Sequence, residues 1–116
     1  MIPVADFNQA ELWTIETTLR ERYGTPIEIQ LADSEVRLRS TDRELTTCPV
    51  VFWQHGECNF VIIKAGDKLY RAQFYYRLHE QYGTGVAEYD DLAECTVSLL
   101  QAQADHDRER QQENSH

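Results

Sequence analysis

The chain has 116 residues, of which 41% are hydrophobic and 27% are charged, a composition typical of one globular domain and not of a disordered chain. Its 20 acidic and 11 basic residues give a formal net charge of −9, which disfavours binding to nucleic acid but leaves room for a local basic patch. No stretch approaches the roughly 20 apolar residues of a membrane span, and residues 1–6 do not resemble a signal peptide. The chain has three cysteines, and an odd number is more typical of reduced thiols than of a disulfide framework. A cytoplasmic location without a membrane partner is therefore expected.

Residues 6–23 are predicted to form a helix. A capping box that pairs Asn8 with Glu11, or one placed two residues earlier on Asp6, would start it. Gly24 suits the left-handed cap that ends many helices. The apolar side chains that recur at helical spacing are Leu12, Ile15, Leu19 and Tyr23.

A first β-hairpin is predicted over residues 27–39, where apolar and polar side chains alternate. Asp33 and Ser34 are the expected turn. The apolar residues of this hairpin share one face, so that face is expected to be buried and the other to be in water. Residues 40–47 read as a polar connection.

Three further strands are predicted over residues 48–78, joined by two tight turns. In these turns Gly56 and Gly66 each stand first in a two-residue loop, as a type II′ turn prefers. If both loops hold two residues, the register follows by counting outward from the turns. Side chains then alternate between the two faces of the sheet.

This register places apolar residues on both faces. The expected core face carries Val50, Phe52, Val61, Ile63, Tyr70, Ala72, Phe74 and Tyr76. The second face is apolar at one side and basic-aromatic at the other: Val51, Trp53, Phe60, Ile62, Lys64, Leu69, Arg71, Gln73, Tyr75 and Arg77. A shift of one residue in either turn would exchange the faces of a strand.

A second helix is predicted to begin at Asp90 or Asp91, after a loop over residues 79–87. Its apolar stripe contains Leu92, Cys95, Leu99 and Ala102. Residues 105–116 contain no apolar side chain, so this polar C-terminal tail either extends the helix into solvent or frays as a disordered end.

The order helix, two strands, three strands, helix predicts a single α+β domain over residues 1–104, with a five-stranded antiparallel sheet. The two helices either cover one face together or divide between the faces. If both lie on the expected core face, an apolar patch on the second face stays uncovered. Since burying each such side chain stabilises by about 1.5–3 kcal/mol, a homodimer through that face is then expected.

The favoured function is that of a small acidic accessory or adaptor protein that acts by protein–protein interaction and not by catalysis. Trp, Tyr and Arg dominate the energy of many interfaces, and the second sheet face is rich in them. The predicted interaction surface consists of Val51, Trp53, Phe60, Ile62, Arg71, Tyr75 and Arg77.

A metal or thiol site is the first alternative. His55 and Cys58 flank the first tight turn, and His79 follows the fifth predicted strand at the same end of the sheet. These are ligand types that zinc accepts, with Cys95 as a fourth candidate, so zinc is the one cofactor considered. A histidine near Cys58 would also suit an activated thiolate.

Single-stranded nucleic-acid binding is the second alternative. It would use Arg71, Tyr75 and Arg77, because bases stack on aromatic rings while arginines track the backbone. The net charge of −9 makes nucleic acid a less favoured partner than protein.

Overall fold

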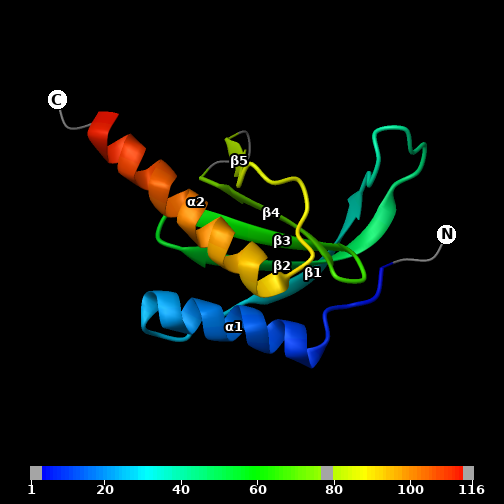
Figure 1. Ribbon diagram of the computed structural model, residues 1–116, viewed down its shortest axis with the longest axis horizontal. Coiled ribbons are helices and arrows are strands. Elements are labelled where there is room, and N and C mark those ends of the chain that lie inside the picture. The colour runs from blue at the N-terminus through cyan, green and yellow to red at the C-terminus, as the bar shows by residue number, and fades with distance from the viewer. Residues whose placement is uncertain (1–3, 77–79, 114–116) are drawn as a thin grey trace.

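The computed structural model describes residues 4–76 and 80–113. In chain order the elements are α1 (Gln9–Tyr23), β1 (Gln30–Val36), β2 (Thr46–His55), β3 (Cys58–Gly66), β4 (Leu69–Tyr75), β5 (Gln81–Gly83) and α2 (Leu92–Glu113). The five strands form one antiparallel sheet in the order β1-β2-β3-β4-β5 (Figure 1). The predicted single α+β domain, with a helix at each end of a five-stranded antiparallel sheet, is confirmed.

Helix α1 begins and ends as its sequence predicts. The Asn8 side chain accepts a hydrogen bond from the Glu11 N–H at 2.8 Å, and the Glu11 carboxylate accepts one from the Asn8 N–H at 2.9 Å. This reciprocal capping box satisfies two N–H groups that a helix start leaves free. Gly24 ends the helix at φ 73°, a left-handed conformation that costs glycine little.

The predicted first hairpin is wrong. Asp33 and Ser34 do not turn the chain but lie in the middle of β1, where Asp33 is opposite Pro49. The real connection spans residues 37–45 and leads into β2, which starts at Thr46. Alternating side chains suit one long strand as well as two short ones, and pairing all of β1 with β2 forms a longer ladder. The short strand β5 was not predicted either, because residues 79–87 were expected to form a loop.

The turn between β2 and β3 is confirmed. Its loop is Gly56–Glu57, and Gly56 has a φ of 62°. His55 lies opposite Cys58, and Trp53 opposite Phe60, as counting from the turn predicts.

The register between β3 and β4 differs from the prediction by one residue. The loop is Asp67–Lys68, with Lys68 at φ 52°, and an irregularity between Lys64 and Gly66 adds one residue to β3. Such a β-bulge reverses the side-chain alternation of one strand relative to its neighbour. Lys64 therefore lies opposite Tyr70, and every side chain of β4 points to the face opposite the predicted one.

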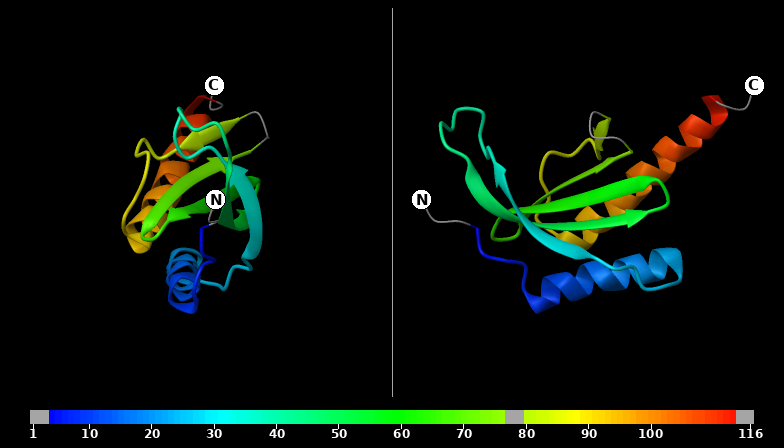
Figure 2. Two further views of the ribbon diagram at one scale, coloured as in Figure 1. Left: turned by 90° about the vertical axis from the view of Figure 1, so that its right-hand side faces the viewer. Right: turned by 180° about the vertical axis from the view of Figure 1, so that it is seen from behind.

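Both helices pack on a single face of the sheet (Figure 2). That face is the one containing Val51, not the predicted core face containing Val50 and Phe52. The fully or almost fully buried side chains that join this face to the helices are Ile15, Leu19, Val51, Trp53, Phe60, Ile62, Phe74, Cys95 and Leu99.

Helix α2 runs to Glu113 and so includes most of the polar segment 105–116. Asp91 accepts a hydrogen bond from the Glu94 N–H at 3.0 Å and caps its start. Further along, the His106 ring lies 4.1 Å from the Tyr82 ring, and the Arg110 guanidinium lies 4.1 Å from the centre of Tyr76. These contacts hold the C-terminal half of α2 against the sheet.

Neither described helix is both long and apolar enough to cross a membrane.

A buried ion pair fixes the start of α1 to the sheet. The Lys64 ammonium donates to the Glu11 carboxylate at 2.8 Å and to the Asp6 carbonyl at 3.1 Å. The Tyr70 hydroxyl donates to the second Glu11 oxygen. Burial disfavours the ionised form of Glu11, but hydrogen bonds from Lys64, Tyr70 and Asn8 outweigh it, so the pKa of Glu11 lies below its ordinary value.

We expect Glu11→Gln to lower the free energy of unfolding by about 3 kcal/mol, because it leaves the Lys64 ammonium buried without a countercharge. Glutamine keeps an acceptor for the Asn8 N–H, so the capping box survives the change. Urea unfolding measures the loss. Glu16→Ala on the exposed side of α1 is the control and should change stability by less than about 0.5 kcal/mol.

The stabilisation from Glu11 should depend on pH. Since its folded pKa lies below the ordinary 4.5, its contribution is complete above pH 4.5 and is lost as the pH falls through the folded pKa. The stability difference between the wild type and Glu11→Gln should therefore be constant near neutral pH and shrink in acid. Urea titrations from pH about 7 to about 3 test this, and a difference that grows in acid would contradict it.

Candidate interaction surface

The predicted seven-residue interaction surface is divided by the fold. Its four apolar members lie beneath the helices and are at most 1% exposed: Val51, Trp53, Phe60 and Ile62. Arg71 and Tyr75 lie on the opposite, helix-free face, because the bulge at Lys64 reverses β4. Arg77 lies outside the described residues. The expectation that these residues share one face was wrong, and the four apolar ones are a core.

Arg71 is half-buried, and its side chain binds two other segments of the chain. Its guanidinium donates to the Leu38 carbonyl at 2.7 Å and forms an ion pair with Glu88 at 3.1 Å. The first contact brings the connection 37–45 from the far edge of the sheet to β4. Arg71 thus binds neighbouring segments with the nitrogens that a nucleic-acid phosphate would need, which weakens the support for a nucleic-acid site.

The rest of the helix-free face is half-buried. Phe52, Val61 and Tyr75 are neither fully exposed nor covered by a helix. The homodimer was predicted through the apolar patch that contains Val51 and Trp53, and the helices bury that patch. A homodimer through another surface stays a prediction.

The proposed zinc or thiol site does not have the surroundings of a reactive centre. Burial raises the pKa of the Cys58 thiol to about 12, the opposite of what an activated thiolate requires. The His55 ring stacks on Tyr23 with 3.9 Å between ring centres. His79 lies outside residues 4–76 and 80–113, and within those ranges no three His, Cys, Asp or Glu side chains are grouped to hold a metal ion.

The other two cysteines are also buried and unpaired. Burial raises the pKa of Cys95 to about 12 and also raises that of Cys48. All three thiols are thus protonated at neutral pH and shielded from reagents.

We expect a thiol reagent at pH about 8 to modify the folded protein slowly, and all three cysteines quickly in denaturant, since the thiolate is the reactive form. Mass spectrometry of the labelled protein counts the modified sites. Rapid labelling of Cys58 in the folded protein would restore the thiol hypothesis.

Strand β1 forms one edge of the sheet and, within residues 4–76 and 80–113, pairs only with β2. It has seven residues, and six of them are exposed. Leu31 is 61% exposed, which is unusual for a leucine in a strand. The other edge is the three-residue strand β5, so β1 is the longer free edge.

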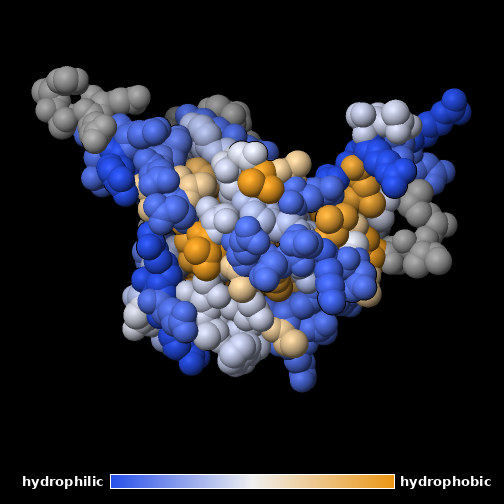
Figure 3. Space-filling view, viewed as in Figure 1, coloured by the Kyte–Doolittle hydropathy of each residue, from blue (hydrophilic) through white to orange (hydrophobic). Residues whose placement is uncertain are grey.

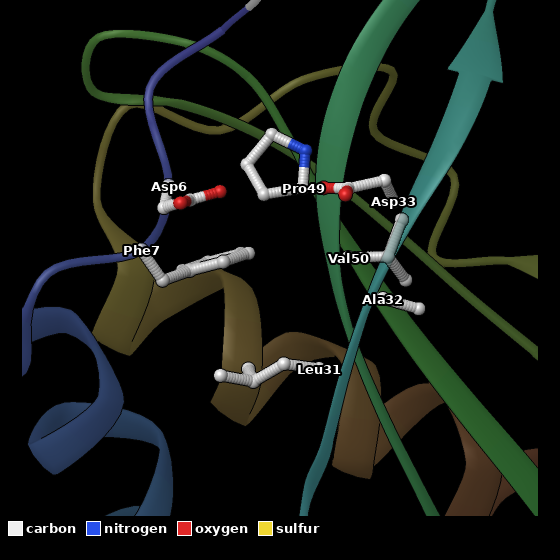
Figure 4. Close-up of a pocket in the computed structure, with 7 residues that line it drawn as sticks. All are labelled: Asp6, Phe7, Leu31, Ala32, Asp33, Pro49 and Val50. Carbon is white, nitrogen blue, oxygen red and sulfur yellow. The ribbon is translucent and has the colours of Figure 1, made fainter.

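A groove of about 290 Å³ runs beside this edge. It lies between the segment that precedes α1 and the middle of β1 (Figure 4). Its lining residues are Asp6, Phe7, Leu31, Ala32, Asp33, Pro49 and Val50. We call β1 and this groove the β1 edge surface.

The groove combines an apolar wall with two carboxylates. Figure 4 shows the side chains of Asp6 and Asp33 on either side of Pro49. Neither carboxylate has a hydrogen bond or ion pair with any described residue. This surface was not predicted from the sequence, because Asp33 was expected to lie in a turn. No pattern of neighbouring residues distinguishes β1 as an edge strand.

Apolar side chains elsewhere on the surface are scattered. Beyond Leu31, the large exposed ones are Trp13, Leu45, Val86 and Val97. On the face that carries both helices, Figure 3 shows separate apolar patches, the most extensive beside the N-terminal segment where the β1–β2 hairpin projects. The β1 edge surface lies at this end of the molecule.

Comparison with known proteins identifies no relative. No family model matches the chain, and neither a curated protein nor a solved structure is significantly similar. Function is therefore argued from the geometry alone.

Proposed function

We propose that this protein is a non-catalytic accessory or adaptor protein that binds a protein partner through the β1 edge surface. The observation that carries the proposal is the seven-residue edge strand, exposed at six positions, beside a groove with an apolar wall and two carboxylates. The proposal keeps the function expected from the sequence and moves it to a different surface.

An edge strand is suited to binding an extended peptide. On its outer side it presents backbone N–H and C=O groups that another strand can pair with. Such strand addition gives affinity through main-chain hydrogen bonds and specificity through pockets for alternate side chains. Here the groove lined by Phe7, Leu31 and Pro49 supplies such a pocket.

The ionisable groups favour a binding role over a catalytic one. Glu11 and Lys64 neutralise each other where α1 joins the sheet, and Arg71 anchors the connection 37–45. Cys58 and Cys95 are core thiols. Free, buried cysteines also fit a reducing compartment such as the cytoplasm, which we include in the proposal.

The test is affinity capture from the native host, with the wild type and two variants. Leu31→Asp places a charge in the β1 edge surface, and Val97→Asp makes the same change on α2, where the side chain is 55% exposed. Both replace exposed side chains, so both proteins should fold. We expect a partner that is kept by the wild type and Val97→Asp and lost by Leu31→Asp. A partner retained by Leu31→Asp would contradict the proposed surface.

A further inference from the structure

We infer that the partner segment is an extended strand in which one apolar and two basic side chains stand at every second position, and that it adds to the free edge of β1. This inference rests on the proposed function and names the chemistry of its partner.

The spacing follows from the geometry of β1. Leu31, Asp33 and Glu35 alternate with the other residues of the strand and so lie on the same face of the sheet. In an added strand, residues on that face also recur every second position and lie opposite these three. An apolar residue then faces Leu31, and a lysine or arginine faces each carboxylate. A parallel strand reads apolar-x-basic-x-basic, and an antiparallel one reads the reverse.

The charge of the groove supports basic residues. The carboxylates of Asp6 and Asp33 form no ion pair with any described residue, and Lys64 contacts Asp6 at its backbone carbonyl. A basic side chain in the groove would lie between the two carboxylates. The net charge of −9 would also speed the approach of a basic segment.

The same charges argue against a second copy of this chain as the occupant. Pairing β1 with β1 would bring Asp33 and Glu35 of one copy against the same carboxylates of the other. Like charges directly opposite in a sheet are destabilising. The carboxylates thus oppose self-pairing of the edge and favour a segment of opposite charge.

The size of the groove limits what enters it. Its volume of about 290 Å³ is at the lower end for small-molecule sites, which hold about 300–1,000 Å³. It lies between β1 and the segment that precedes α1, within reach of long side chains from a strand paired with β1. The groove therefore suits one or two side chains of a longer peptide.

The first test is selection from a phage-displayed library of random dodecapeptides on the immobilised full chain. Enriched peptides that carry two basic residues and an apolar one at alternate positions support the inference. Enriched peptides without this pattern, but lost on Leu31→Asp, would overturn the inference and leave the proposed function standing. Enrichment of no peptide that depends on Leu31 would overturn both.

The second test measures the Kd of a synthetic enriched peptide by fluorescence anisotropy. Asp33→Lys should weaken binding by roughly tenfold or more, because an attraction across the paired strands becomes a repulsion. Asp90→Lys is the matched control, since it changes the net charge equally at an exposed position before α2. An unchanged Kd for Asp33→Lys, or an equal loss in both variants, would overturn the inference.

Discussion

The structure depends on one side chain, Lys64, placed at an irregularity in β3. Lys64 lies on the helix-covered face together with Phe60 and Ile62, and the bulge that follows it brings Tyr70 to the same face. The buried Lys64 ammonium is neutralised by Glu11 of α1. A lysine in that position without Glu11 would leave an unpaired charge in the interior, at a cost of several kcal/mol. The same pair fixes where the N-terminus of α1 lies, and the bulge decides which face of β4 becomes core.

The remaining surfaces follow from that arrangement. With Phe74 and Tyr70 turned inward, one sheet face is apolar enough to bury both helices. Arg71 is then turned to the other face, where it holds the connection 37–45 through the Leu38 carbonyl. Both faces are thus at least partly occupied. The long free edge of β1, with the groove beside it, is one surface that the fold leaves available.

Acidity has two roles at that edge. A seven-residue strand whose outer edge is unpaired among the described residues can pair with the same edge of another copy, and such pairing leads to aggregation. Asp33 and Glu35 oppose this because two such strands repel each other. In the proposed complex, the same carboxylates would also select a partner of opposite charge.

Features that depend only on neighbouring residues could be predicted from the amino-acid sequence. The capping box of Asn8 and Glu11, the cap at Gly24 and the tight turn at Gly56 are local, and each lies where its pattern predicts. The order of helices and strands also followed, because periodicity and turn signals suffice for the α+β class.

Long-range strand pairing sets which face of the sheet is the core and which edge is free. The extra residue between Lys64 and Gly66 has no signature distinct from a two-residue turn, yet one residue reverses every side chain of β4. Likewise, nothing near Asp33 distinguishes a turn from the middle of a strand; the pairing with distant Pro49 does. The buried core and the β1 edge surface could not be predicted from the sequence, because both depend on contacts between residues far apart in the chain.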